Sequence, residues 1–231
     1  MLYIVSTPIG NLKDITIRAL DTLQEVDYIA AEDTRHTGKL LKHYEIDKPL
    51  LSYHSHSGFA KIEKIIQLLK EGKKIAVVSD AGTPGISDPA YSLIQEAIKE
   101  QISIIPIPGA SSLLAAIVAS GMPMNQFLYL GFLPLKKGRQ TILKSLVDET
   151  RTVVIFESPH RIVKTLTQLH EYLGDRQVAL CRELTKIYEE VLRAPLSTHI
   201  TYYKTTSPKG EYVLVIAPDN FRARYENPQA H

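Results

Sequence analysis

The chain has 231 residues, a formal net charge of +2, a hydrophobic fraction of 44% and a charged fraction of 23%. This length fits one large domain or two domains of roughly 100 residues each, and the composition excludes a disordered or collagen-like chain. The near-neutral charge decides little about partners, because a nucleic-acid binder shows either a stronger basic excess or a local basic patch.

The apolar runs and the cysteine content point to a soluble protein of the cytoplasm. The longest apolar runs fall short of the ~20 residues that a membrane span needs. The first residues, LYIVST, are typical of a strand rather than of an export signal. A lone cysteine, Cys181, excludes a disulfide framework and a cysteine-rich metal site, in keeping with a reducing compartment. We therefore expect a cytoplasmic protein that makes no use of a membrane.

Apolar segments typical of strands alternate with amphipathic segments along the whole chain, which predicts an α/β fold with a largely parallel sheet. The predicted strands cover residues 2–6, 28–32, 50–53, 74–79, 102–107, 127–131, 152–157, 177–183 and 211–217. Two helical stripes with i, i+3, i+4 spacing are formed by Ile62, Ile65, Ile66 and Leu69, and by Ile162, Leu166, Leu169 and Leu173. Gly72 and Gly174 follow these stripes, where helices often end.

A turn-rich stretch near the middle of the chain, ASGMPMNQF, predicts a domain boundary. We expect an N-terminal α/β domain over residues 1–119 and a C-terminal α/β domain over residues 120–220. The polar residues 221–231 are expected to form a loose tail.

Three loops in the first half follow directly on predicted strands: STPIGN (6–11), SDAGTPGISDP (79–89) and PGASS (108–112). Each could be an ordinary turn. In an open α/β sheet, however, ligands bind at the carboxyl ends of the strands, so together these loops predict one pocket.

The common nucleotide-binding fingerprints are absent. The chain contains neither G-x-G-x-x-G nor G-x-x-x-x-G-K-[ST], which excludes the usual nicotinamide, flavin and P-loop solutions and the usual glycine-rich methyltransferase loop. It also lacks G-x-S-x-G, so a covalent hydrolase is disfavoured. The predicted pocket must bind its ligand with a different backbone geometry.

The segment AAEDTRHTG places Glu32, Asp33, Arg35 and His36 at the end of the second predicted strand. Asp33 or Thr34 could simply cap the helix that follows. Four ionisable side chains within five residues go beyond what capping requires and indicate a functional site.

A metal site is not expected. His54 and His56 have a spacing that puts both on one face of a strand, but no cysteine or H-E-x-x-H helix supplies further ligands.

In the second half, FESPHR, CRELTK and KGEY place polar and charged residues at strand ends, which indicates a pocket that two domains share. A short basic cluster is best explained as the solvated start of a helix; it contains Lys136, Lys137, Arg139 and Lys144.

Eight motifs in order, TPIGNLKDITIRAL, AAEDTRHTGKLL, VVSDAGTPGISDP, PGASS, YLGFLP, FESPHR, RELTK and KGEYVLV, carry a resemblance from residue 2 to about residue 217. In these motifs the chain resembles the tetrapyrrole methylase superfamily, and within it the enzymes that methylate small-subunit ribosomal RNA. The resemblance implies two α/β domains with a cofactor cleft between them, often as a homodimer. It also implies methyl transfer from S-adenosylmethionine to the ribose 2′-hydroxyl of a cytidine in the decoding region of 16S rRNA.

The resemblance, with the local chemistry of the loops, assigns the cofactor contacts. These are Pro8, Ile9, Asp80, Gly82, Thr83, Ile86, Ser111, Ser112, Phe156 and Tyr212. Thr83 stands where the superfamily usually has an aspartate. Ala90 and Ala110 are mild departures from its pattern.

A ribose hydroxyl is a weak nucleophile, so a general base or a cation should assist its deprotonation. We expect Asp33 to be this base, with Glu157 as the runner-up, and Arg35 to bind a phosphate or steady the alkoxide. The expected contacts to the RNA backbone are Arg161, Arg182, Lys186 and Lys209.

Two alternatives stay open. One is a methyltransferase of the same superfamily that acts on a tetrapyrrole or a protein. The other is a non-catalytic RNA-binding relative, which an eroded cofactor loop would favour; no such erosion is seen in residues 79–89.

Overall fold

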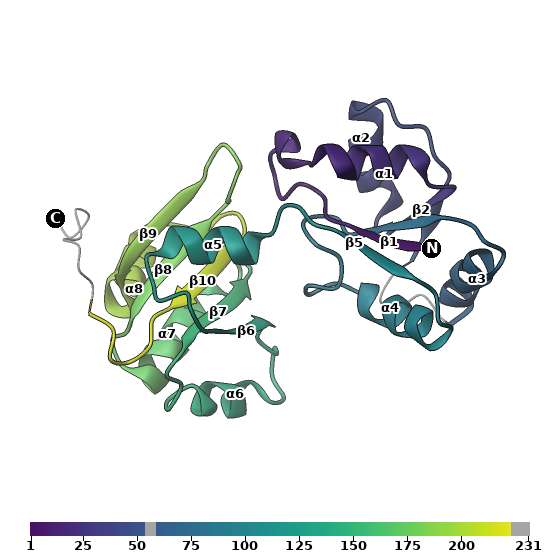
Figure 1. Cartoon of the computed structure of the whole chain (residues 1–231). Helices are drawn as coiled ribbons and strands as arrows, with labels where there is room; N and C mark the ends of the chain where they lie inside the picture. The colour runs from purple at the N-terminus through teal and green to yellow at the C-terminus, as the bar shows by residue number, and fades with distance from the viewer. Residues whose placement is uncertain (54–58, 223–231) are drawn as a thin grey trace. The chain divides into compact units, whose positions relative to one another are not determined.

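The computed structural model describes residues 1–53 and 59–222, without the side chain of Phe59. The chain divides into two compact units, Met1–Ser111 and Ser112–His231. Figure 1 shows a sheet with flanking helices in each, and each unit is described here by itself.

The first unit is built on a parallel sheet of order β3-β2-β4-β1-β5. Its strands are β1 (Leu2–Val5), β2 (Tyr28–Ala31), β3 (Leu50–Ser52), β4 (Ile75–Val78) and β5 (Ile104–Ile107). Its helices are the 3-10 turn η1 (Leu12–Asp14), α1 (Ile17–Glu25), α2 (Thr34–His43), α3 (Phe59–Lys70) and α4 (Ala90–Lys99). The five strands predicted for this half and their parallel arrangement are confirmed.

Helices cover both faces of this sheet (Figure 1). Leu23 of α1 and Leu41 of α2 pack in the cluster on one face, whereas Ile65 of α3 and Leu93 of α4 pack in the cluster on the other. Burial on both sides explains why β4 is apolar at every position. The predicted stripe of α3 therefore points into the core, and Gly72 follows this helix with a φ of 86°.

The chain leaves two neighbouring strands of the first sheet, β1 and β4, in opposite directions across the sheet. From β1 the chain moves across β4 to β2, whereas from β4 it moves across β1 to β5. Right-handed crossovers in opposite directions put α1 and α4 on opposite faces, as observed. The carboxyl ends of two such strands are where open α/β sheets bind ligands.

The second unit has a mixed sheet of order β6-β7-β10-β8-β9. Its strands are β6 (Phe127–Phe132), β7 (Thr152–Glu157), β8 (Gln177–Arg182), β9 (Glu190–Pro195) and β10 (Tyr212–Ile216). Its helices are α5 (Ser112–Ser120), α6 (Arg139–Ser145), α7 (Ile162–Leu173) and α8 (Leu196–Thr205). The predicted stripe of α7 is buried, and Gly174 caps this helix with a φ of 70°.

The parallel arrangement predicted for this half is wrong, and one of its strands is missing from the prediction. Only β6 and β7 pair in parallel, while β7, β10, β8 and β9 pair antiparallel. The last strand returns between β7 and β8, and apolar runs carry no information on strand direction. Strand β9 was not predicted, because its sequence EVLRAP has no apolar run and is mostly half-buried against β8.

The division between the units falls after Ser111, eight residues before the predicted boundary at residue 119. Helix α5 belongs to the second unit because it packs against β8, β9 and β10. Within the described parts of the chain, no helix combines the length and the apolar character that crossing a membrane requires.

Candidate functional site

The loops that follow β1, β4 and β5 are joined by hydrogen bonds at the carboxyl edge of the first sheet. The Thr7 N–H donates to the Gly82 carbonyl at 2.9 Å, and the Gly82 N–H donates back to Thr7 at 3.1 Å. The hydroxyls of Ser6 and Thr83 lie 2.8 Å apart, and Thr83 Oγ1 donates to the Ala110 carbonyl at 3.3 Å. The structure thus brings together the three loops that the sequence singled out.

Two glycines let these loops approach closely. A Cβ on Gly109 would lie 2.9 Å from Ser6 Cβ, closer than real Cβ atoms come. A Cβ on Gly82 would lie 3.3 Å from Ile9 Cγ2, and the φ of Gly82 is 81°, in the region that favours glycine. Larger residues at these positions would separate the loops after β1, β4 and β5.

The middle of the loop after β4 is a tight turn over Thr83–Ile86. The Ile86 N–H donates to the Thr83 carbonyl at 3.3 Å. Pro84 in the second position and Gly85 in the third, with a φ of 91°, follow the pattern of a type II turn. The turn leaves Ile86 40% exposed.

The second Ser-Asp of this loop is structural. The Asp88 carboxylate accepts from the Gly85 N–H at 2.7 and 2.8 Å and from the Ala90 N–H at 2.9 Å. It therefore ties the turn to the first residue of α4. Ser87 takes a positive φ of 65° to make this possible.

The segment after β2 joins the same edge through Asp80. The Asp33 N–H donates to Asp80 Oδ1 at 3.1 Å. Asp33 caps α2, since its Oδ1 accepts from the Arg35 N–H at 2.8 Å, so the capping role that the sequence allowed is confirmed. Arg35 Nη2 also lies 2.8 Å from Asp33 Oδ2, and the Arg35 side chain is 88% exposed.

The Asp33–Arg35 pair shifts the pKa of both of its side chains. Hydrogen bonds from the Arg35 side chain and backbone hold the pKa of the Asp33 carboxyl well below its usual range. The same side-chain hydrogen bond raises the pKa of Arg35. Asp33 is therefore a charged hydrogen-bond acceptor at neutral pH that takes up a proton poorly.

The predicted cofactor residues divide between the units. On the loops of the first unit lie Pro8, Ile9, Asp80, Gly82, Thr83, Ile86 and Ser111. Ser112 opens α5, Phe156 lies in β7, and Tyr212 begins β10. Phe156 packs edge-on against Tyr129 and Phe132, and the Tyr212 hydroxyl accepts from the Lys209 N–H at 3.2 Å. A role for these second-unit residues in cofactor binding stays a prediction.

Sequence reasoning did not single out Ser6 or Gly109, although both lie inside motifs that it quoted. Ser6 supplies the hydroxyl that meets Thr83, and Gly109 allows the approach to Ser6. A hydroxyl residue directly after a buried strand and a Pro-Gly pair after its neighbour are the signals that could have found them.

Glu157, the runner-up base, is buried in the second unit with a side chain 0% exposed. Its Oε2 accepts from Thr165 Oγ1 at 2.6 Å, and its Oε1 accepts from the Ser158 N–H at 2.8 Å. Arg161 Nε lies 3.2 Å from Oε1. These contacts use both carboxylate oxygens within the protein, which gives Glu157 a structural role.

Three of the four predicted RNA contacts are held in internal ion pairs. Arg161 pairs with Glu157, Arg182 Nε lies 3.2 Å from Glu190 Oε2, and Lys186 Nζ lies within 2.9 Å of two carboxylates. The carboxylates that hold Lys186 are Glu183 and Glu211. Lys209 is exposed.

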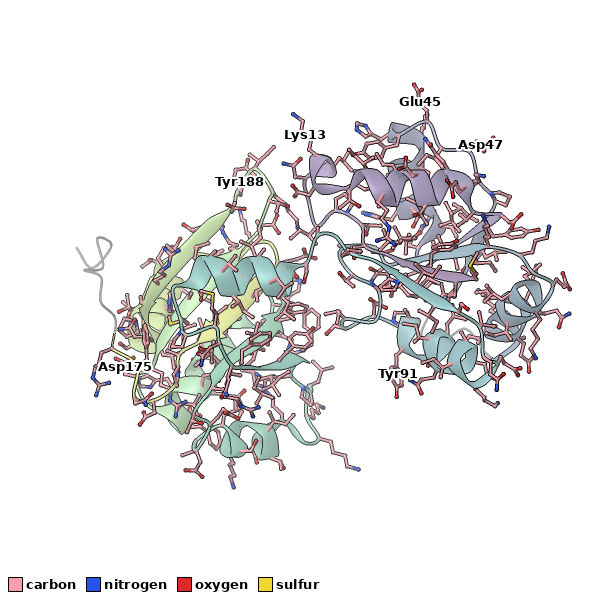
Figure 2. The ribbon with its side chains drawn as sticks, in the orientation of Figure 1. Lys13, Glu45, Asp47, Tyr91, Asp175 and Tyr188 are labelled. Carbon is pink, nitrogen blue, oxygen red and sulfur yellow. The ribbon has the colours of Figure 1, made fainter. Side chains whose placement is uncertain are left out.

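The hairpin that carries Lys186 is locally strained. Glu183 and Thr185 have positive φ values of 49° and 67°, which are uncommon for residues with side chains. The Thr185 N–H donates to Glu189, which helps to hold this backbone. Figure 2 shows Tyr188 at the tip of the hairpin between β8 and β9, where its side chain is exposed.

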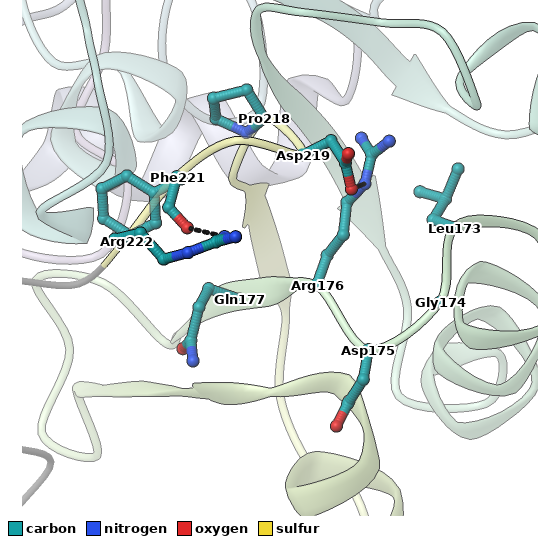
Figure 3. A pocket seen from close by; sticks show the side chains of 9 residues that line it. All are labelled: Leu173, Gly174, Asp175, Arg176, Gln177, Pro218, Asp219, Phe221 and Arg222. Atoms are coloured by element: carbon teal, nitrogen blue, oxygen red, sulfur yellow. Dashed lines mark hydrogen bonds and ion pairs between the residues drawn. The ribbon is translucent and has the colours of Figure 1, made fainter.

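A separate cavity of about 440 Å³ lies at the opposite end of β8 and β10 (Figure 3). It is lined by Leu173, Gly174, Asp175, Arg176, Gln177, Pro218, Asp219, Phe221 and Arg222. The guanidinium of Arg176 lies beside Asp219, with Nε 3.8 Å from the carboxylate. The lining contains none of the residues that the sequence predicts for a site.

Residues 1–53 and 59–222 contain no group of three histidine, cysteine or acidic side chains placed to hold an ion. His54 and His56 lie outside the described residues.

Comparison with known proteins gives a consistent picture. Residues 1–199 match the family model of tetrapyrrole (corrin/porphyrin) methylases. The chain is 50% identical to a protein of Synechocystis sp. named ribosomal RNA small subunit methyltransferase I, over 94% of this chain and 78% of the relative. It is also 50% identical to the Thermotoga maritima protein of the same name, over 94% of this chain and 97% of the relative.

Solved structures agree on the fold. The methyltransferase CobJ superimposes with a TM-score of 0.71 at 18% identity over 96% of this chain and 95% of that chain. A diphthine synthase gives 0.71 at 15% identity, with coverages of 94% and 89%. On the match of residues 1–199 and the identity to these relatives, the chain belongs to the tetrapyrrole (corrin/porphyrin) methylase family.

Proposed function

We propose that this protein is a methyltransferase that moves a methyl group from S-adenosylmethionine to the ribose 2′-hydroxyl of a cytidine in 16S rRNA of the small ribosomal subunit. The observation that carries the proposal is 50% identity to the Thermotoga relative over nearly the full length of both chains. The cytidine and the 2′-hydroxyl enter through the resemblance of the motifs.

The loops at the carboxyl edge of the first sheet fit S-adenosylmethionine. This cofactor supplies an electrophilic methyl group on a positively charged sulfur. Its amphiphilic, zwitterionic structure suits a site that combines the part-buried hydroxyl of Thr83, the carboxylate of Asp80 and the exposed side chain of Ile86. We propose that these residues hold it, together with Pro8, Ile9, Gly82 and Ser111.

The rigid loops would mainly align the reactants, which is the chief need of an in-line displacement. The backbone hydrogen bonds between Thr7 and Gly82 and the contact of the Ser6 hydroxyl with Thr83 fix the loop after β4 before any ligand binds. Preorganisation of this kind lowers the entropy cost of binding.

Arg35 is proposed to meet an RNA phosphate or to steady the developing alkoxide, because its side chain is exposed and oriented by Asp33. The lowered pKa of Asp33 reduces its efficiency as a general base. We therefore assign Asp33 the role of orienting Arg35. Neither Asp33 nor the buried Glu157 is assigned the role of accepting the proton of the ribose hydroxyl.

A cytoplasmic location and a homodimer complete the proposal. Both follow from the resemblance, and the size of the purified protein by sedimentation tests the second.

The test offers the purified protein labelled S-adenosylmethionine and three acceptors: small ribosomal subunits from a strain that lacks the modification, a cell protein extract, and a tetrapyrrole such as uroporphyrinogen. We expect label in the RNA of the subunits alone. Label in a tetrapyrrole or a protein would support the alternative substrates, and binding of subunits without transfer would support a non-catalytic relative.

A further inference from the structure

The last residue of β6 and the segment that leads from it toward α6, residues 132–137, lie on the second unit (Figure 1). Its sequence is FLPLKK. Phe132 is 52% exposed and Leu135 is 71% exposed, and both Lys136 and Lys137 are exposed. An exposed aromatic ring and two exposed cations within six residues are a combination that can bind unpaired nucleotides, through stacking and phosphate neutralisation.

The charge of this segment has one sign. From Phe132 to Lys144 the chain contains no aspartate or glutamate. In the part of the chain that the structure describes, the side chains of Lys136 and Lys137 form no ion pair, in contrast to Arg161, Arg182 and Lys186. These two lysines can therefore neutralise phosphates without breaking an internal contact.

A largely buried network of side chains holds the backbone of the segment on its inner side. Arg161 donates to the Leu133 carbonyl and pairs with Glu157. Arg139, which is 4% exposed, donates from Nη1 to the Pro134 carbonyl at 3.3 Å and from Nη2 to Thr165 Oγ1 at 2.7 Å. Thr165 completes the network by donating to Glu157 at 2.6 Å.

This network places the buried Arg139 and the half-buried Arg161 around the buried carboxylate of Glu157. Burial of charges is costly unless they are paired and hydrogen-bonded, and here the bonds go to the carbonyls of the exposed segment. The two guanidinium groups and the single carboxylate leave a positive charge beneath the segment, which favours an anionic partner.

The strand before the segment also contributes. The register of β6 against β7 shifts between Tyr129 and Gly131, and Gly131 has a φ of 61°. A bulge at a strand end redirects the side chain that follows. Phe132 consequently points out of the core while its ring packs edge-on against Phe156 at 5.7 Å.

We propose that residues 132–137 bind a single-stranded segment of the substrate RNA, with Phe132 stacking on a base and Lys136 and Lys137 meeting phosphates. The inference rests on the proposed function. In this proposal, residues 132–137 take the place of Arg161, Arg182 and Lys186 as the main RNA contacts of the second unit. Arg139, Glu157 and Arg161 then hold the backbone of this segment in place.

The lysines are tested by the double substitution Lys136→Ala with Lys137→Ala, measured by binding to unmodified small subunits over a range of salt concentrations. We expect weaker binding and a salt dependence of log K that is shallower by about 1.4 to 1.8, the contribution of two phosphate contacts. The matched control, Lys64→Ala with Lys204→Ala, removes two exposed lysines of α3 and α8 and should leave binding and slope close to wild type.

The stacking residue is tested by Phe132→Ala and Phe132→Leu, which should each weaken subunit binding by roughly 5- to 140-fold. Phe132→Tyr keeps the ring and should stay within about twofold of wild type, since either ring can stack. Affinity for S-adenosylmethionine, measured by calorimetry, should be unchanged in all three variants, which separates loss of RNA contact from misfolding.

Three results would overturn the inference while the proposed function stands. The first is that the wild-type protein methylates subunits while the double lysine variant binds them as tightly as wild type. The second is equal binding by Phe132→Leu and wild type. The third is dissociation of an oligomer by Phe132→Ala in sedimentation, which would assign the patch to a second copy of the chain. A wild-type protein that neither binds nor methylates subunits removes both proposals.

Discussion

Ser6 Oγ and Thr83 Oγ1 lie 2.8 Å apart, so the loops after β1 and β4 are joined through side chains as well as through the backbone. We expect Ser6→Ala to lower the free energy of unfolding by about 1 kcal/mol, the usual net value of a hydrogen bond, and Thr83→Val to lower it by more, since Thr83 also donates to the Ala110 carbonyl. Because both remove the same contact, the double variant should lose less than the sum. Urea unfolding of the four proteins checks this, and strictly additive losses would contradict the contact.

Gly109 is predicted to tolerate no side chain. Its Cβ would lie 2.9 Å from Ser6 Cβ, so Gly109→Ala should move the loop after β5 and cost about 1–3 kcal/mol, as overpacked sites do. Affinity for S-adenosylmethionine should fall as well. The control is Gly38→Ala in α2, where a Cβ meets nothing within 4 Å and alanine should stabilise the helix by up to ~1 kcal/mol.

Asp33→Asn separates the cap of α2 from the charge that orients Arg35, because asparagine caps helices as well as aspartate does. We expect unchanged S-adenosylmethionine affinity and weaker binding of subunits. Because the pKa of Asp33 is lowered, its carboxyl stays ionised even near pH 4, the ordinary range for an aspartate, and loses its charge only at more acidic pH. The pH profile of methyl transfer between pH 5 and 9 should therefore keep its shape in the variant.

A profile whose acidic limb disappears in Asp33→Asn, with cofactor affinity intact, would restore Asp33 as the general base.

Glu157→Gln leaves the buried Arg139 and the half-buried Arg161 without a nearby carboxylate. Removal of one partner from a buried pair costs about 3–5 kcal/mol, so we expect a large fall in the urea midpoint. The matched control is Glu211→Gln, which removes a carboxylate that is 81% exposed and pairs with Lys186. An exposed pair contributes about 0–1 kcal/mol, and equal losses in the two variants would show that the network is not as buried as described.

The sequence was sufficient to predict the frame of the site. Apolar strands such as Ile75–Val78 are recognisable because both of their faces are buried, and the alternation with helices implied that the loops after β1, β4 and β5 share one edge. Side-chain partners are not readable in this way. Lys186 looks like a free cation in the sequence, yet it meets Glu211, a carboxylate 25 residues away that only the folded chain brings near.

Helix α5 shows the same limit at the level of domains. Its sequence SLLAAIVAS is apolar around most of its circumference, so the pattern does not reveal which sheet it covers. The antiparallel return of β10 and the half-buried β9 escaped for a related reason, since their positions depend on pairing rather than on local composition.

The central claim, methyl transfer to a ribose, is tested most directly by mass spectrometry of 16S rRNA from unmodified small subunits after incubation with the protein and S-adenosylmethionine. We predict one additional methyl group, located on the ribose 2′-oxygen of a cytidine, and its absence when the cofactor is omitted. Methyl groups found only on bases, or RNA of unchanged mass in the presence of cofactor-bound protein, would contradict the claim.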